Sequence, residues 1–232
     1  MENRSMENRM ENRSMEYKTI NGCFGERYIG CAEKNVHITI NGTPGNALGA
    51  YLDGGIIEVN GNVQDAVGDT MNDGKIVVHG NAGDALGYAM RGGSIFIRND
   101  AGYRTGIHMK EYKEKKPAIV IGGKAGSFLG EYLAGGLIVV LGIGVNGVPV
   151  GNFTGTGMHG GKIFLRTNAE LPLLPKQVVK EVASEDELKE IIPYLNEFSQ
   201  HFGFNTEEIL KESFYILKPN AKNPYKQLYT AY

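Results

Sequence analysis

Three consecutive rows of sequence decide the fold: HITINGTPGNALGAYLDGG (residues 37–55), IIEVNGNVQDAVGDTMNDG (residues 56–74) and KIVVHGNAGDALGYAMRGG (residues 75–93). Each row begins with a short apolar strand, and further strands of this kind begin at residues 94, 118, 137 and 162. The step between strands is nineteen residues wherever no insertion intervenes. A fixed period of this size indicates stacked copies of one supersecondary unit.

Apolar side chains occupy the same positions in every row. Two strand positions separated by one residue are apolar throughout, which indicates a strand with one buried face. The first holds Ile38, Ile57, Ile76, Ile95, Ile119, Ile138 and Ile163, and the second holds Ile40, Val59, Val78, Ile97, Ile121, Val140 and Leu165. Two more columns follow in each row: Leu48, Val67, Leu86, Thr105, Leu129 and Val150, and then Leu52, Met71, Met90, Met109, Leu133 and Met158.

These columns and the tight turns between them describe a triangular coil in which like residues stack at the ~4.8 Å spacing of neighbouring strands. No row carries a helical stripe long enough for an α/β crossover. The sequence therefore predicts an all-β fold, a single-stranded parallel β-helix of about seven coils with a C-terminal helical tail. Parallel crossovers are almost always right-handed, so we expect a right-handed helix.

Glycines mark the corners of the coil. Gly30, Gly49, Gly68, Gly87 and Gly106 recur at nineteen-residue intervals, and we expect Gly130 and Gly151 to continue this column. The long sixth row is expected to bulge twice, at Leu141–Gly147 and at Asn152–Gly157. Glycine reaches positive φ at little cost, so the column needs no ligand to explain it.

The chain divides into three parts. Residues 1–16 repeat one short polar unit, MENRS, and are predicted to form a disordered leader. Residues 17–168 form the β-helix, and its first coil caps the stack. Residues 169–232 begin with a proline-flanked linker and become helical, with capping boxes at Ser184/Glu187 and Asn205/Glu208. Pro193 is expected to kink or restart the first of these helices, and the last residues are expected to lie along a surface without regular structure.

Composition excludes several classes of function. The formal net charge is −2, which gives no electrostatic reason to bind nucleic acid or an anionic membrane. Two cysteines are too few for a disulfide framework or a metal cage. No apolar run approaches the ~20 residues of a membrane span. The first residues also lack the apolar core of a signal peptide, so we expect a cytoplasmic protein.

One apolar column faces away from the predicted core. This outer stripe consists of Val77, Phe96, Val120, Val139 and Phe164. A continuous apolar stripe on the outside is a surface meant to be covered, either by the C-terminal helices or by another subunit. A charged insertion, KEYKEKKP at Lys110–Pro117, replaces a glycine pair in the fourth row and is called the flap below. The outer stripe and the flap around Lys113 are the predicted interface.

Other motifs are weaker candidates for a binding or catalytic site. Asn46, Asp65 and Asp84 share one column, and stacked carboxylates can hold a hard cation. Asp and Asn also suit turns through their own hydrogen bonds, and Tyr103 and Ser127 interrupt the column. Glycine-rich loops such as Gly142–Gly147 lack the following helix that a dinucleotide site requires. No Ser/His triad, acid pair or zinc spacing emerges, so we predict no catalytic residue, no bound cofactor and at most an Asp65/Asp84 cation ladder.

Two stretches of the sequence are similar to a known family: VGNFTGTGMHGGKIFL (residues 150–165) and YLNEFSQHFGFNTEEIL (residues 194–210). These rows and the tail resemble the GXGXG domain, a right-handed β-helix that ends the large subunit of glutamate synthase. The resemblance extends over about residues 19–228 and includes the segment Lys218–Pro224. It implies a free-standing version of that domain, without catalytic residues of its own.

The family implies the partners. In glutamate synthase an amidotransferase part releases ammonia from glutamine, and a synthase part carrying FMN and an iron–sulfur cluster converts 2-oxoglutarate to glutamate. We therefore expect a scaffold subunit of such an oxidoreductase complex, with glutaminase and FMN-binding synthase chains as partners and self-association left open. Three alternatives remain: the β-helix subunit of formylmethanofuran dehydrogenase, a stand-alone carbohydrate-active β-helix protein and a self-assembling solenoid.

Overall fold

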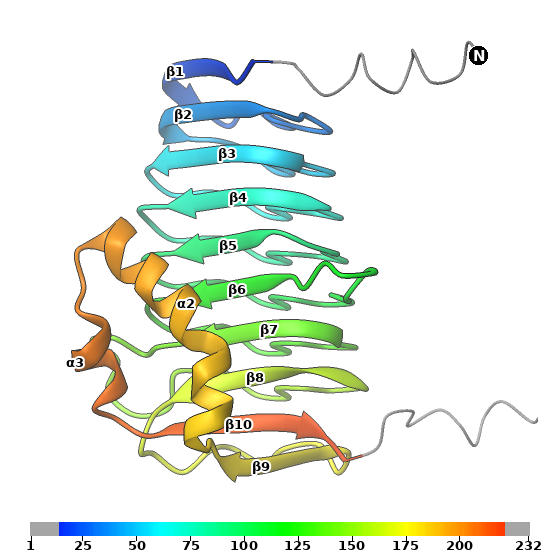
Figure 1. The fold of residues 1–232 in the computed structure, drawn as a ribbon, viewed down its shortest axis with the longest axis vertical. Helices are drawn as coiled ribbons and strands as arrows, with labels where there is room; N and C mark the ends of the chain where they lie inside the picture. Colours follow the sequence, from blue (N-terminus) through cyan, green and yellow to red (C-terminus); the bar gives the residue numbers. More distant parts are fainter. Residues whose placement is uncertain (1–13, 221–232) are drawn as a thin grey trace, which may run out of the picture.

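A computed structural model describes residues 14–220 of the 232-residue chain. Eight parallel strands are stacked in sequence order along one side of a solenoid (Figure 1). Their bounds are β1 Glu16–Phe24, β2 Val36–Thr43, β3 Asp53–Asn60, β4 Asp73–Val78, β5 Ser94–Ile97, β6 Ala118–Ile121, β7 Ala134–Val140 and β8 Gly160–Arg166. The remaining elements are β9 Val178–Val182, α2 Glu185–Phe202, α3 Thr206–Leu210 and β10 Phe214–Pro219.

The strand register confirms the nineteen-residue repeat. Ile38 pairs with Ile57, Ile57 with Ile76, and Ile76 with Ile95, and the column continues through Ile119 and Ile138 to Ile163. Each coil therefore lays its strand directly on the equivalent strand of the preceding coil. The predicted parallel β-solenoid of about seven coils is correct.

The predicted apolar columns form the main core. Both inward strand positions are buried in every coil from β2 to β8, and so is the methionine and leucine column from Leu52 to Met158. Thr105 is fully buried within its otherwise apolar column and donates its hydroxyl to the carbonyl oxygen of Gly102, 3.3 Å away. This bond offsets the cost of burying a hydroxyl.

The register corrects the prediction for the sixth row. Ala125 pairs with Val150, and the N–H of Gly155 donates to the carbonyl of Leu129, as the N–H of Gly130 does to Thr105. Val150 therefore continues the column of Ala125, and Thr154 and Gly155 take the places predicted for Val150 and Gly151. The row has one insertion, before Val150, and residues 152–157 are a regular turn. Two glycine-rich stretches in one row allowed the wrong alignment.

The corner glycines meet two demands at once, and Gly87 illustrates both. Its φ is +67°, a left-handed conformation that costs an ordinary residue ~1 kcal/mol or more. A Cβ at this position would lie 2.4 Å from Cδ1 of Ile119, two coils further on. The glycine column thus leaves the space into which the isoleucine column packs.

The two ends of the solenoid are closed differently. In the first coil Lys18 occupies the inward position held by Ile38 in the next coil, and its ammonium lies 3.3 Å from a Glu33 carboxylate oxygen. This ion pair puts charge at the otherwise open end of the core, which disfavours head-to-tail addition of another coil there. At the other end β10 pairs antiparallel with β8 and with β9, so the sheet order is β1 to β8, then β10 and β9.

The C-terminal part is therefore less purely helical than predicted. The stretch from Phe214, expected to be irregular, begins with a strand, and β9 was not foreseen. The capping box of Ser184 and Glu187 is confirmed, and Asn205 caps α3 by accepting from the N–H groups of Glu207 and Glu208. Helix α2 continues through Pro193 without interruption. The predicted leader of residues 1–16 lies mostly outside the described residues, and Glu16 belongs to β1.

We predict that Gly87→Ala lowers the free energy of unfolding by about 2–4 kcal/mol. The left-handed conformation contributes about 1–2 kcal/mol and the overlap with Ile119 the rest. Chemical denaturation followed by circular dichroism measures the change.

Gly22→Ala is the matched control, because Gly22 has a φ of +69° but no atom within 4 Å of the added Cβ. It should cost only the conformational part, about 1 kcal/mol. Equal losses in the two variants would show that close packing against Ile119 contributes nothing.

Candidate functional site

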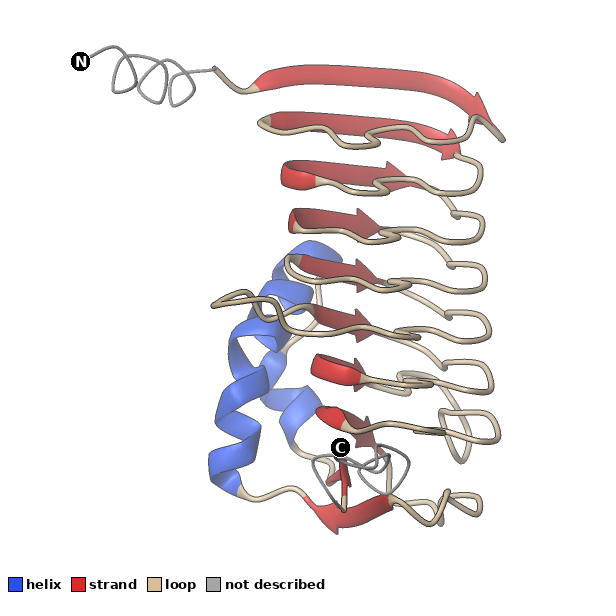
Figure 2. Ribbon diagram, turned by 90° about the vertical axis from the view of Figure 1, so that its right-hand side faces the viewer, coloured by secondary structure: helices blue, strands red, loops and turns tan. Residues whose placement is uncertain are grey.

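The outer stripe is covered by the chain itself. Val77, Phe96, Val120, Val139 and Phe164 are at most 1% exposed and form a second hydrophobic cluster with Ile191, Leu195 and Phe198 of α2. Figures 1 and 2 show α2 lying along the outer face of the sheet. Of the two coverings that the sequence left open, the structure contains the C-terminal helix. The five residues are thus buried, and the prediction that they face another subunit is corrected.

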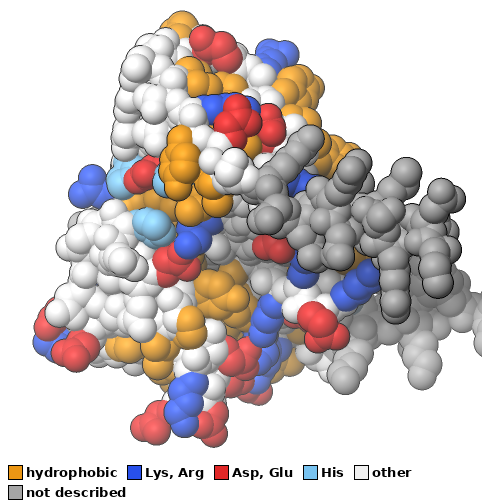
Figure 3. All heavy atoms as spheres, turned by 45° about the horizontal axis from the view of Figure 1, so that its top comes forward, with side chains coloured by type: hydrophobic (Ala, Val, Ile, Leu, Met, Phe, Trp, Pro, Cys, Tyr) orange, Lys and Arg blue, Asp and Glu red, His pale blue; other side chains and the backbone are white. Residues whose placement is uncertain are grey.

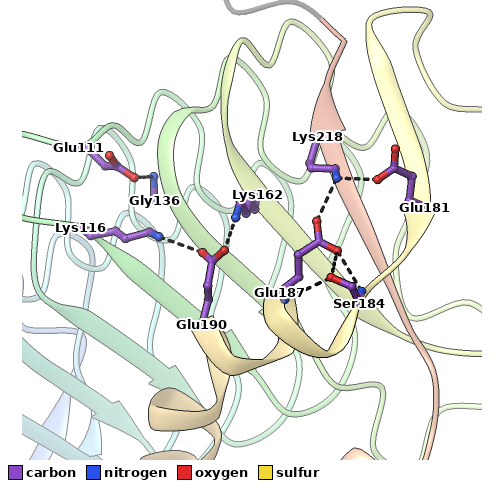
Figure 4. Close-up of polar contacts among 9 residues, drawn as sticks. All are labelled: Glu111, Lys116, Gly136, Lys162, Glu181, Ser184, Glu187, Glu190 and Lys218. Carbon is purple, nitrogen blue, oxygen red and sulfur yellow. Dashed lines mark hydrogen bonds and ion pairs between the residues drawn. The ribbon is translucent and has the colours of Figure 1, made fainter.

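The N-terminus of α2 is fixed by charge. Glu187 accepts hydrogen bonds from the backbone N–H and the hydroxyl of Ser184, and its other oxygen lies 3.0 Å from the ammonium of Lys218 in β10 (Figure 4). These contacts lower the pKa of Glu187 to about 2, the bond from the Ser184 backbone being the largest cause. Lys218 also pairs with Glu181 of β9 at 2.5 Å, and these pairs raise its pKa. One lysine therefore joins α2 to both antiparallel strands.

A second charged group attaches the flap to α2. The carboxylate of Glu190 pairs with Lys116 of the flap, 3.2 Å away, and with Lys162 of β8 (Figure 4). Burial raises the pKa of Glu190, but the hydrogen bonds from Lys162 and Lys116 outweigh burial, and the net pKa is lowered. At the start of the flap, Glu111 accepts the backbone N–H of Gly136 in the next coil. The flap is thus tied both to α2 and to the solenoid.

The tip of the flap lies back over earlier coils. Lys115 pairs with Asp73 at 2.9 Å and with Asp53 at 3.4 Å, and its ammonium donates to the carbonyl of Asn72. Lys113 is exposed at positive φ, with its ammonium 5.3 Å from the centre of the Tyr112 ring. Lys113 is thus accessible on the surface, and its place in an interface stays a prediction.

The aspartate column has a structural role in the turns. Oδ1 of Asp65 accepts the backbone N–H of Asp84, and Oδ1 of Asp84 accepts the N–H of Tyr103, both at 2.8 Å. Asn46 accepts from Asp65 in the same way. Each side chain therefore satisfies a backbone donor of the next coil. Among residues 14–220 no group of three or more His, Cys, Asp or Glu side chains is placed to hold a metal ion.

The sequence reasoning missed a surface that we call the aromatic face, formed by Tyr103, Arg104, His108, Phe128, Tyr132 and Phe153. The rings of Tyr103 and Phe128 lie 5.2 Å apart and those of Phe128 and Phe153 4.9 Å apart. The imidazole of His108 stacks on Tyr132 at 5.0 Å with planes 8° apart. The guanidinium of Arg104 lies over Tyr103 and Phe128, and its Nε lies 3.0 Å from the Glu131 carboxylate.

Folding does not require large side chains at these positions. Arg104, Phe128 and Phe153 occupy a left-handed position that is filled in the earlier coils by Ala47, Ala66 and Ala85. Tyr132 likewise occupies the position of Ala89. Phe153 is 55% exposed and Tyr132 36%. A column that changes from alanine to arginine and phenylalanine in one half of the solenoid is typical of a contact surface.

No helix within residues 14–220 is both long and apolar enough to cross a membrane. The histidines near α2 serve packing: His79 lies 2.9 Å from Glu58 and edge-on to Phe202, and His201 contacts Phe96. Burial, together with Lys75, lowers the pKa of His201. These side chains therefore help to hold α2 on the sheet.

Comparison with known proteins agrees with this architecture. The GXGXG motif family matches residues 3–220, nearly the whole chain. The chain belongs to the GXGXG family, that of the C-terminal domain of the glutamate synthase large subunit. It is also 42% identical, over 229 residues, to an uncharacterized protein of Methanocaldococcus jannaschii, an alignment that covers 95% of this chain and 88% of the relative. The resemblance drawn from the sequence is confirmed at the level of the family.

We predict that Glu187→Gln lowers the free energy of unfolding at neutral pH by about 0.5–2 kcal/mol, the range for losing a helix cap. The folded pKa is depressed, so the carboxylate stabilises the protein above its unfolded pKa of about 4.5, and this contribution is lost as the pH falls toward 2. Denaturation at a series of pH values measures the difference between variant and wild type, which should vanish at the acid end.

Glu185→Gln serves as the control, because Glu185 lies in the same first turn but outside the capping box. It should leave stability nearly unchanged. A pH-independent difference for Glu187→Gln would contradict the role given to the charged carboxylate.

Proposed function

We propose that this protein is a non-catalytic scaffold subunit of a glutamate synthase complex, which forms glutamate from glutamine and 2-oxoglutarate. The observation that carries the proposal is membership of the GXGXG family over nearly the whole chain. Under this proposal, the chain supplies the β-helix domain of the complex. FMN, the iron–sulfur cluster and the glutamine-hydrolysing cysteine would then belong to partner chains.

The shape of the solenoid supports a scaffold role. Its core is continuous from the first to the last coil and is reinforced on one side by α2, so it offers rigid surfaces at fixed separations. Two of these surfaces carry chemistry suited to protein contacts. The aromatic face offers stacked rings beside an arginine, the residue types enriched in the centres of interfaces, and the flap offers the exposed charge of Lys113.

Native purification from the source organism tests the proposal. Partners that contain flavin and an iron–sulfur cluster, with glutamine-dependent glutamate formation by the complex, would support it. Partners that contain molybdenum or tungsten would instead assign the chain to formylmethanofuran dehydrogenase. Isolation of the chain without any partner would overturn the scaffold role.

We predict that Tyr132→Ala and Phe153→Ala each weaken binding of the synthase partner at least about tenfold, as expected for central interface aromatics. The fold should tolerate both changes, because alanine already occupies equivalent positions at Ala89 and Ala85. Calorimetry or surface plasmon resonance with the purified partner measures the affinity, and thermal denaturation checks the fold.

Tyr51→Ala is the matched control. Tyr51 occupies the same column as Tyr132, also with positive φ, and is 52% exposed, but it lies in the N-terminal half away from the aromatic face. It should leave affinity unchanged. Equal effects of Tyr51→Ala and Tyr132→Ala on affinity would show that the aromatic face is not part of the interface.

A further inference from the structure

The N-terminal end of the sheet carries a long unpaired edge. β1 is hydrogen-bonded to β2 on one side, and no strand within residues 14–220 lies on its other side. It has nine residues and is the longest strand of the structure. An exposed strand edge offers N–H and C=O groups at fixed spacing, and another strand is the partner that satisfies them best.

The hydrogen bonds to β2 show which groups are free. The N–H of Glu16 donates to the carbonyl of Asn35 at 2.8 Å, so this residue directs its backbone groups toward β2. Because backbone groups alternate in direction along a strand, those of Tyr17 and Thr19 point to the free edge. The side chains of both residues are exposed.

Exposed hydrophobic side chains gather at the same end. Tyr17 is 74% exposed and Phe24, at the other end of β1, is 89% exposed. Tyr28, in the same coil, is 63% exposed. In Figure 3, where this end comes forward, hydrophobic side chains lie beside acidic and basic ones. Burying these rings would stabilise an interface at this end.

The charged side chains of β1 suit pairing with a second copy of the same strand. Glu16 and Lys18 lie on the same face of β1, two residues apart and on either side of Tyr17. An antiparallel strand with the same sequence, centred on Tyr17, places Glu16 of each copy opposite Lys18 of the other. Opposite charges facing each other across an antiparallel pair are favourable, and so is the pairing of the two Tyr17 rings.

We propose that β1 pairs antiparallel with β1 of a second copy of this chain, across a two-fold axis normal to the sheet near Tyr17. Such an axis keeps the same face of the sheet inward in both copies. The contact is isologous, so it closes at two chains. The Lys18–Glu33 ion pair at the end of the core opposes the alternative, in which solenoids stack head to tail into a filament. This inference goes beyond the scaffold role and does not depend on it.

The test uses the purified full-length chain alone and the variant Thr19→Pro. Proline removes an N–H that points to the free edge, and its ring obstructs a neighbouring strand, whereas the bonds to β2 come from Glu16, Lys18 and Ile20. Thr19→Ala is the matched control, since it keeps the N–H. Light scattering after size exclusion, at a series of micromolar concentrations, measures the mass.

We expect the wild type and Thr19→Ala to have twice the chain mass of 25.3 kDa. Thr19→Pro should dissociate with a Kd raised at least about tenfold, while its melting temperature stays within about 3 °C of wild type. A second variant, Tyr17→Lys, keeps the test valid if Thr19→Pro does not fold. It places like charges at the two-fold axis and should also produce monomers.

A monomeric wild type would overturn the proposal, as would Thr19→Pro and Tyr17→Lys variants that both stay dimeric. Hydrogen exchange distinguishes the other occupants of the edge. Slow exchange of the Tyr17 and Thr19 amides in a monomer would indicate that the thirteen residues preceding Ser14 pair with this edge. Filaments would instead indicate head-to-tail stacking.

Discussion

The structure depends on the stacking of each coil on the equivalent residues of the previous coil. Residues nineteen apart pair in register, backbone hydrogen bonds join successive coils, and the isoleucine column packs directly upon itself. The stacking is possible because each turn holds residues at positive φ, with glycine where a Cβ would meet an isoleucine from a later coil. An insertion is tolerated only where it can leave the coil and return in register, as the flap and residues 141–149 do.

A solenoid of this kind exposes ends and sides, and the chain treats them differently. One side is covered by α2, whose apolar residues fill the outer stripe and whose acidic residues are held by Lys218, Lys162 and Lys116. The C-terminal end is crossed by antiparallel strands. Within residues 14–220, nothing covers the aromatic face or the free edge of β1. These two surfaces account for the partner contact and the self-association that we propose.

The function that we propose therefore depends on surfaces. The carboxylates most suggestive of a metal site, Asp65 and Asp84, are used to hold backbone N–H groups of the next coil. Glu187 and Glu190 hold α2 and the flap in place. These roles fit a domain whose contribution is position, with the chemistry supplied by other chains.

The solenoid, its period, its inward columns and the cap of α2 could all be predicted from the sequence, because each follows from local spacing or from a pattern repeated in register. The prediction from sequence misaligned the sixth row, because two glycine-rich stretches in that row both fitted the repeat. The three-dimensional structure was needed to show that α2 covers Val77 to Phe164 and that Phe214–Pro219 pairs with β8. The aromatic face also appeared only there, because its rings come from separate coils and meet through stacking. The contacts of α2 and β10 lie outside the repeat and leave no periodic trace, so three-dimensional packing alone reveals them.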